Sequence, residues 1–471
     1  MLFPTVAFAV FFLIAFLANW LLRPTRRLWL LVMTGLSLVF YGWTDARFVL
    51  LLVGSIVVNW GFGEAIARAK HPQHLVRLAV AVNLVFLGFF KYFGFFVDSF
   101  SRTLDVVGLD VQPPILQIAL PIGISFFTFH AISYVIDIGR GDIRPMPLAD
   151  FGLYLSFFPH LVAGPIVRAS EFAPQIEGRA DPRNIEAAEA FRLIAAGLFK
   201  KVVVSSYLAS TLVDPVFGAP EAHGRWELVV AVYAYAIQIY ADFSGYTDIA
   251  IGCALLLGIR FPQNFDAPYR ALSLQDFWRR WHMTLSRWLR DYLYIPLGGS
   301  RDGVRRTRRN LFLTMVLGGL WHGAAWTFVV WGAIHGGFLI AERVVRERWA
   351  ATHAEPLLPA TARRPLQWAL TFNVVCFAWI FFRADSLGTA FDVIGGILGS
   401  TLPSPMVTGL ILLTIALALA SQFVPPRAVV AVQDRFAVLA PGTQAVCLAG
   451  ALTVIDVLGP DGVAPFIYFQ F

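Results

Sequence analysis

Charged side chains are scarce in this sequence. Asp, Glu, Lys and Arg together make up 14% of its 471 residues, whereas hydrophobic residues make up 58%. Soluble globular domains carry about 25% charged residues, so this shortage excludes an ordinary soluble enzyme and indicates a polytopic membrane protein. The few charges are biased toward Lys and Arg, with a net charge of +7. We expect them to mark cytoplasmic loops rather than a nucleic-acid surface.

Cysteine is also rare, and its placement gives no sign of metal or disulfide chemistry. Cys253, Cys376 and Cys447 stand far apart in apolar segments and show no CxxC spacing. The sequence has no HExxH motif, so a metal-dependent membrane hydrolase is a weak hypothesis. Internal repeats and a sizeable soluble domain are absent as well. We therefore predict no metal, no cofactor and a single membrane domain over residues 1–471.

Long apolar runs fill most of the chain and predict roughly ten to twelve transmembrane helices. The first run ends at Leu22, and three arginines follow within five residues. Because it lacks the charged start and cleavage site of a signal peptide, we interpret it as a retained first span. The positive-inside rule then predicts that the first loop is cytoplasmic and that the N-terminus lies on the other side of the membrane. Pro159 and Pro165 interrupt a later run, which predicts a broken or re-entrant piece.

The most informative apolar run covers residues 311–342 and carries His322 near its middle. An imidazole at membrane depth loses hydration that apolar neighbours cannot replace. Such a group normally faces a cavity, a partner or a substrate path, so His322 is a candidate functional residue. Gly318, Gly319 and Gly323 flank it and allow a close approach by another backbone or a ligand. Packing of this histidine against a neighbouring helix explains the stretch equally well.

A second segment, residues 272–298, has the period of an amphipathic helix lying in the membrane interface. Its apolar stripe, with His282 at the edge, consists of Trp278, Trp281, Leu285, Leu289 and Tyr292. Nine arginines and two aspartates between Arg279 and Arg309 give the region a local charge of +7. That charge suits either anionic lipid headgroups or a phosphorylated ligand such as a nucleotide-bearing thioester.

Two carboxylates, Asp242 and Asp248, lie within the apolar run over residues 228–259. Carboxylates at that depth are costly unless they are hydrogen-bonded or solvated, so this helix should face an interior cavity. A transporter that conducts a proton or solute past these groups is therefore a hypothesis from another class. The inverted repeats that many transporters show are not visible here.

Seven stretches of the sequence carry a resemblance to a known family. In chain order they are PIGISFFTFHAISYVID, FFPHLVAGPIVR, QIYADFSGYTDIAIG, NFDAPYRALSLQDFWRRWHMTLSRWLRDYLYIPLGGSR, NLFLTMVLGGLWHGAAWTFVVWGAIHG, WIFFRADS and PFIYFQF. Their order and composition closely resemble the membrane-bound O-acyltransferases, and within them the membrane subunits of bacterial alginate O-acetyltransferases. The resemblance implies an all-α fold in which transmembrane, interfacial and re-entrant helices surround a central funnel.

The resemblance also implies site residues. His322 matches the family's intramembrane catalytic histidine, and His282 matches a second catalytic histidine. A neutral imidazole at His322 can accept the proton of an attacking hydroxyl. Candidate donors to the oxyanion are Trp321, Trp326, Asn264 and His282. We expect the donor or acceptor path to be lined by Asp242, Asp248, Asn264, Trp278, Arg279, Arg280, Trp321 and Trp326.

The activity that the resemblance implies is the transfer of an acetyl group from a cytoplasmic thioester, foremost acetyl-CoA, for O-acetylation of an exported polysaccharide such as alginate. A periplasmic acetyltransferase or esterase-like partner is expected to pass the group on, so the polysaccharide is reached indirectly. Relatives that acetylate peptidoglycan or cellulose, or that transfer D-alanine, leave the acceptor open. The lipid bilayer is the remaining expected partner, and nucleic acid is not one.

Overall fold

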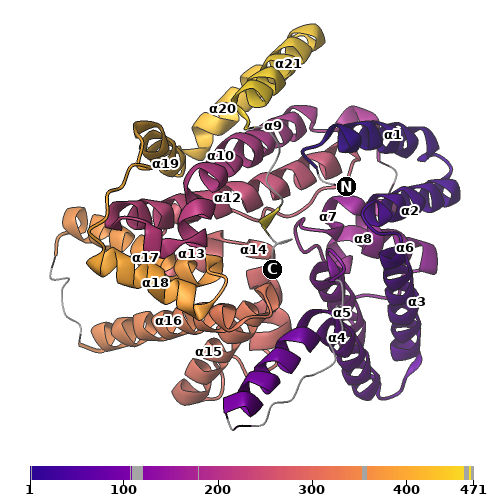
Figure 1. Ribbon diagram of the computed structural model, residues 1–471. Helices are drawn as coiled ribbons and strands as arrows, with labels where there is room; N and C mark the ends of the chain where they lie inside the picture. The colour runs from indigo at the N-terminus through magenta and orange to yellow at the C-terminus, as the bar shows by residue number, and fades with distance from the viewer. Residues whose placement is uncertain are drawn as a thin grey trace. The chain divides into compact units, whose positions relative to one another are not determined.

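The computed structural model describes residues 1, 3–106, 108, 120–178, 180–352, 358–460 and 466–467. Over these residues the regular elements are all helices, which confirms the predicted all-α class. The chain forms two compact units, coloured by residue number in Figure 1. The first unit comprises Met1–Ile194 and Ile249–Pro262, and the second comprises Ala195–Asp248 and Gln263–Phe471. The prediction of one membrane domain around a central funnel stays a prediction.

The first unit contains the N-terminal helices, most of which are long and apolar. Their bounds are α1 (Val6–Leu22), α2 (Arg26–Gly42), α3 (Arg47–Arg68), α4 (Pro72–Val106), α5 (Ile124–Arg140), α6 (Leu148–Ser156), α7 (Phe158–Leu161), α8 (Ala169–Glu177) and the first part of α9 (Ala187–Leu198). Pro159 lies in the one-turn helix α7, directly after the break that ends α6. The broken piece predicted from the prolines is therefore confirmed, because proline cannot donate to the preceding helical turn.

The second unit carries the candidate site and most of the remaining helices. Its elements are η2 (Phe199–Ser205), α10 (Ser206–Leu208), η3 (Ala209–Val213), α11 (Asp214–Gly218), α12 (Arg225–Leu256, up to Asp248), α13 (Leu274–Arg280), α14 (Met283–Leu289), η6 (Arg290–Tyr294), α15 (Gly303–His322), α16 (Trp326–Thr352), α17 (Ala360–Arg383), α18 (Leu387–Gly399), α19 (Gly409–Ser421), α20 (Pro426–Ala437) and α21 (Pro441–Leu458). Here η2, η3 and η6 are π-helical, and such segments often occur at functional sites.

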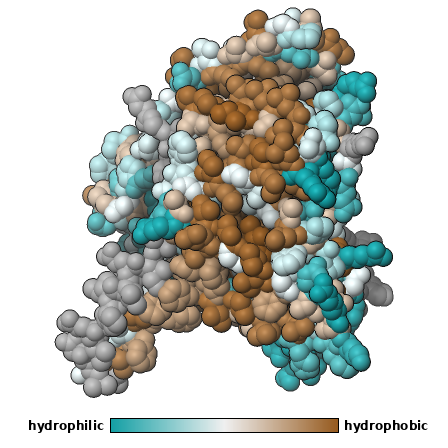
Figure 2. Space-filling model, turned by 90° about the vertical axis from the view of Figure 1, so that its right-hand side faces the viewer, coloured by the Kyte–Doolittle hydropathy of each residue, from teal (hydrophilic) through white to brown (hydrophobic). Residues whose placement is uncertain are grey.

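Seven helices among the described residues are long and apolar enough to cross a membrane. The number rises to eight if α19 and α20, which meet at 91°, count as one broken span. This is fewer than the predicted ten to twelve, because several apolar runs form shorter helices such as α1 and α18. Many large apolar side chains on these helices are exposed, as expected where lipid rather than water is the solvent. Figure 2 shows one face on which hydrophobic side chains form a broad area bordered by hydrophilic ones.

The run over residues 311–342 is two helices rather than the single span that we predicted. Helix α15 ends at His322, and α16 starts at Trp326. The two helices pack closely because glycines face the neighbouring backbone. A Cβ at Gly319 would lie 2.2 Å from the Phe328 carbonyl oxygen, and one at Gly332 would lie 2.4 Å from that of Met315. Gly319 and Gly332 thus allow the two helices to form a tight hairpin, and His322 lies at its bend.

The amphipathic segment over residues 272–298 is also broken, so the predicted single helix is wrong. Ser273 caps α13 as expected, its Oγ accepting from the Asp276 amide at 3.1 Å. Helix α13 ends at Arg280, and α14 begins only at Met283. The apolar stripe is nevertheless packed inward, since four of its five members are buried: Trp281, Leu285, Leu289 and Tyr292.

Candidate active site

His322 is the last residue of α15 and is 3% exposed. Three aromatic rings surround its imidazole. The ring centroids of Trp321, Trp331 and Phe382 lie 5.0, 5.1 and 5.2 Å from that of His322. Because Trp331 comes from α16 and Phe382 from α17, the hairpin and the next helix together build this cage. The cage therefore buries the imidazole among aromatic rings.

His282 occupies the break between α13 and α14 and is fully buried. Its φ of 42° lies in the left-handed region, which residues other than glycine rarely adopt. Hydrogen bonds hold the backbone there: the Met283 amide donates to the Asn264 carbonyl at 2.9 Å, and the Ser286 amide donates to the His282 carbonyl at 3.0 Å. A strained conformation fixed by its surroundings is a common feature of active sites.

Asn264 fixes the protonation of the His282 ring. Its Oδ1 accepts from the Thr284 amide at 3.2 Å and from Thr284 Oγ1 at 2.9 Å. The Thr284 backbone N–H can only donate a hydrogen bond, so the Asn264 side-chain atom that faces it is the oxygen rather than the nitrogen. The same oxygen lies 3.1 Å from His282 Nδ1, which must therefore carry the proton. It follows that Nε2 holds the free lone pair, and Nε2 has no partner among the residues that the structure describes.

Burial has a second effect on His282. It lowers the pKa of the imidazole to about 3, because the charged form cannot be solvated in this environment. The ring is accordingly neutral at physiological pH. A neutral imidazole whose Nδ1 carries the proton cannot donate from Nε2. His282 Nε2 is thus placed as a hydrogen-bond acceptor, and in this neutral form it cannot act as the oxyanion donor that we predicted.

Trp321 connects the two histidines. Its ring centroid lies 6.1 Å from that of His282 and 5.0 Å from that of His322. Phe243 of α12 packs edge-on against His282 at 4.7 Å and completes the wall. The structure therefore brings together four predicted residues from three parts of the sequence: Asn264, His282, Trp321 and His322.

The two aspartates of α12 each have a lysine partner. Asp242 and Lys201 form a buried ion pair, and the Ile467 amide donates to Asp242 Oδ2 at 2.8 Å. Asp248 accepts from Lys200 Nζ at 2.6 Å. Breaking a buried pair would leave an uncompensated charge, so these contacts stabilise the packing of η2 on α12. This arrangement gives no support to an open proton path through the aspartates.

The other predicted path residues are spread more widely. Trp278 Nε1 donates to His335 Nδ1 at 3.3 Å, which links α13 to α16 beside the cage. Arg280 pairs with Asp266 and Asp276, both at 2.8 Å, whereas Arg279 is exposed. Trp326 is 55% exposed at the start of α16, unlike the buried Trp321. Among the three tryptophans, Trp321 is the one that contacts both histidines.

Sequence reasoning missed two members of the site. Thr284 helps to fix the Asn264 amide, and its position two residues after His282 gave no signal for this role. Trp331 faces His322, and its Nε1 has no hydrogen-bond partner among the described residues. Its position nine residues after His322 was visible in the sequence, but the bend that folds α16 back on α15 was not predicted.

Long apolar helices and two buried imidazoles describe a polytopic membrane protein with ionisable side chains in its interior. The chain belongs to the MBOAT, or membrane-bound O-acyltransferase, family, whose model matches residues 78–384. It is therefore an acyltransferase and a multi-pass membrane protein. The matched region contains every residue that we predicted for the site.

Relatives with related names share most of the chain. It is 42% identical over 399 residues to the "Probable alginate O-acetylase AlgI" of Pseudomonas aeruginosa. This aligned region covers 83% of this chain and 74% of the relative. It is 36% identical over 438 residues to the "Peptidoglycan O-acetyltransferase" of Helicobacter pylori, covering 85% and 80%. The "Teichoic acid D-alanyltransferase" of Streptococcus thermophilus is 29% identical over 311 residues, covering 61% and 75%.

Proposed function

We propose that this acyltransferase takes an acetyl group from a cytoplasmic thioester, acetyl-CoA in the first place, for O-acetylation of an exported polysaccharide such as alginate. A periplasmic acetyltransferase or esterase-like protein would be the partner that receives the group. The observation that carries the chemistry is the pair of buried histidines, His282 and His322, which both contact Trp321. The choice of alginate is supported by the higher identity to alginate O-acetylases than to the D-alanyltransferases.

The proposed location is the bacterial inner membrane, with the N-terminus on the periplasmic side. Arg23, Arg26 and Arg27 follow the first apolar helix, and such charges favour the cytoplasmic face. A thioester made in the cytoplasm and an acceptor outside it lie on opposite sides of this membrane. The reaction centre must then be reached by the donor from one side and by the acceptor from the other.

In the proposed reaction an acceptor hydroxyl attacks the thioester carbonyl carbon while His322 accepts the hydroxyl proton. A C–O bond forms, the C–S bond breaks, and the thiol sulfur leaves as a thiolate. A well-placed general base contributes about 10²- to 10⁴-fold to such a step. His282 Nε2 supplies a second acceptor in the same place, which can bind an N–H or O–H group of a substrate and orient it.

The negative charge on the carbonyl oxygen needs a hydrogen-bond donor. Trp331 is the strongest candidate because its indole ring contacts His322 and its buried Nε1 has no partner among the described residues. Asn264 Nδ2, which likewise has no partner there, is a second candidate. Trp331 takes the place of the exposed Trp326 in the proposal, whereas Asn264 was already predicted from the sequence.

Trp331→Phe tests this assignment. Loss of one oxyanion donor typically lowers kcat by about 10²- to 10³-fold, and we expect a fall of that size with little change in KM. Steady-state acetyl-CoA cleavage by the purified variant measures both constants. Trp368→Phe is the matched control, since the Trp368 indole is bonded to the Tyr269 carbonyl at 2.8 Å. Equal kcat values for the two variants would remove Trp331 from the mechanism.

The function itself is tested with wild-type protein in lipid nanodiscs and labelled acetyl-CoA. We expect release of free thiol that depends on the protein, and loss of O-acetyl groups from secreted polysaccharide in cells that lack the chain. If peptidoglycan lost its O-acetyl groups instead, the acceptor in the proposal would be wrong but the chemistry right. Solute uptake into proteoliposomes, without any thioester cleavage, would contradict the proposal altogether.

A further inference from the structure

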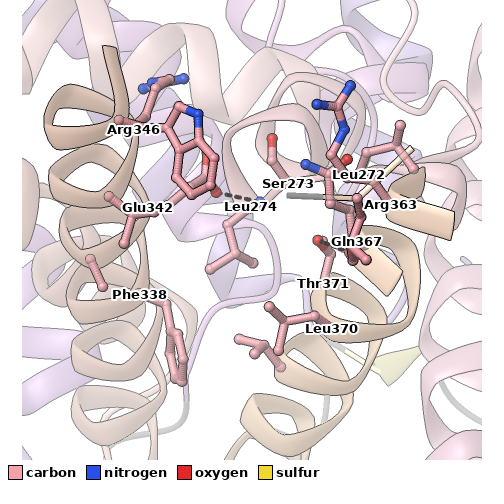
Figure 3. Close-up of a pocket in the computed structure, with 15 residues that line it drawn as sticks. Leu272, Ser273, Leu274, Phe338, Glu342, Arg346, Arg363, Gln367, Leu370 and Thr371 are labelled. Carbon is pink, nitrogen blue, oxygen red and sulfur yellow. Dashed lines mark hydrogen bonds between the residues drawn. The ribbon is translucent and has the colours of Figure 1, made fainter. Parts of the chain in front are cut away.

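A large cavity in the second unit lies apart from the histidines and plays no part in the proposed reaction. It has a volume of about 810 Å³ and lies between α16 and α17, with Leu272–Leu274 forming a third wall (Figure 3). This volume falls within the range of about 300–1,000 Å³ that is typical of small-molecule sites. Apolar side chains dominate its lining, among them Phe338, Leu370 and Val374. Phe338 and Leu370 are 42% and 64% exposed, so the cavity is open along one side.

One end of the cavity is positively charged. Arg346 of α16 and Arg363 of α17 lie on opposite walls at that end, and Phe338 and Leu370 lie toward the other end (Figure 3). Arg346 donates to Gln275 Oε1 at 2.7 Å. The Arg363 guanidinium forms no ion pair or hydrogen bond with any residue that the structure describes. Its charge is therefore available to a ligand.

Glu342 is the acidic residue in the lining, and its carboxylate is hydrogen-bonded to the backbone. Its Oε2 accepts from the Leu274 amide at 2.8 Å, which fastens α16 to the first turn of α13. Carboxylates at a helix start are stabilised by the free amides there. The two guanidinium groups thus leave a net positive charge at the mouth of an apolar cavity.

The spacing along the helices matches the depth profile of a bilayer. The candidate spans Trp326–Trp349 and Ala360–Arg383 run in opposite directions beside the cavity, so Arg346 and Arg363 fall at the same end of the two helices (Figure 3). Phe338 precedes Arg346 by eight residues, or about 12 Å of helix, and Val374 follows Arg363 by eleven, or about 16 Å. Half of the hydrocarbon core is about 15 Å thick. The arginines therefore lie at headgroup depth and the apolar wall at acyl-chain depth.

We propose that this cavity binds one molecule of an anionic phospholipid. Its phosphate pairs with Arg346 and Arg363, because guanidinium groups bind phosphate oxygens through paired hydrogen bonds. One acyl chain lies against Phe338, Leu370 and Val374. Trp349, which also lines the cavity, stands at the interface where tryptophan is favoured. The lipid holds the ends of α16 and α17 together, and this role is independent of which acyl group the enzyme transfers.

The test is lipid binding by the full chain, measured by native mass spectrometry after titration with phosphatidylglycerol or phosphatidylcholine. We expect wild type to bind one phosphatidylglycerol about 10- to 30-fold more tightly than phosphatidylcholine. Arg346→Gln combined with Arg363→Gln should remove that preference. Arg348→Gln combined with Arg364→Gln is the matched control, because these arginines lie on the same helices but outside the cavity lining. The control should keep the preference.

Three outcomes would overturn the proposal. Equal affinities of wild type for the two lipids would show that no headgroup is recognised. An equal loss in the control variant would mean that the preference comes from general surface charge. Displacement of phosphatidylglycerol by acetyl-CoA would assign the cavity to the donor instead. Leu370→Trp is a second variant, in which the larger side chain fills the apolar end of the cavity. It should weaken the binding of both lipids while both arginines stay unchanged.

Discussion

His322→Ala should lower the rate of acetyl-CoA cleavage by about 10²- to 10⁴-fold, which is the contribution expected of a lost general base. The imidazole is 3% exposed in an aromatic cage, so water cannot easily take its place as a base. Because the Cα of His322 lies in ordinary helix at the end of α15, the shorter side chain should not disturb the backbone. Thioester cleavage by the purified variant, normalised to folded protein, measures the effect.

His335→Gln is the control for this experiment. His335 is as buried as His322 and belongs to the same helical hairpin, but its Nδ1 accepts a hydrogen bond from Trp278. An amide can keep that hydrogen bond, so we expect activity within about tenfold of wild type. If His322→Ala cleaved acetyl-CoA as fast as His335→Gln, the assignment of His322 as the base would be wrong.

Asn264→Leu should lower kcat by about 10²-fold or more. The change keeps the size of the side chain but removes the oxygen that holds His282 Nδ1–H. The imidazole can then turn or adopt the other tautomer, and loss of the correct tautomer costs about 10⁴-fold in the serine proteases. Thr284→Val is the control, since it removes one donor to the same oxygen and leaves the histidine bonded. We expect it to retain activity within a few fold.

Asn264→Asp tests whether Asn264 acts by positioning His282 or only by stabilising the fold. The carboxylate still accepts from Nδ1, so activity at pH 8 should recover above that of Asn264→Leu. Its negative charge stabilises the imidazolium and raises the pKa of His282 from about 3 toward neutrality. Protonation of Nε2 removes the acceptor, so the activity of this variant should fall as the pH drops from 8 to 6. In the wild-type protein His282 stays neutral between pH 8 and pH 6, so we expect its titration to cause no change in activity over that range. A profile identical to wild type would argue that Asn264 has a structural role alone.

The sequence predicts helix type and membrane character well because both depend on local composition. Apolar runs of 20 residues, proline breaks and the Ser273 cap act over one or two turns. The bends at His282 and at Gly323 were not predicted. Periodicity continues through both of them, and only contacts with distant residues such as Asn264 and Phe328 show that the helices stop there.

The two histidines of the candidate site could be predicted from the sequence, but their arrangement relative to each other could not. His282 and His322 were distinguished by polarity within apolar surroundings and by resemblance to a family. Their shared neighbour Trp321 depends on the fold of the second unit, and the choice of tautomer depends on which Asn264 atom faces Thr284. Trp331 was missed because a tryptophan among apolar residues resembles any other core residue until its partners are known.

The left-handed backbone at His282 limits how this position can change during evolution. Asparagine, aspartate and glycine adopt that conformation with little strain, whereas β-branched residues do not. An exchange of imidazole for amide at this position would therefore preserve the turn and alter only the chemistry. At His322 the helical backbone accepts almost any residue, so selection there acts on the side chain alone. The two histidines of the proposed reaction centre are thus open to different evolutionary paths.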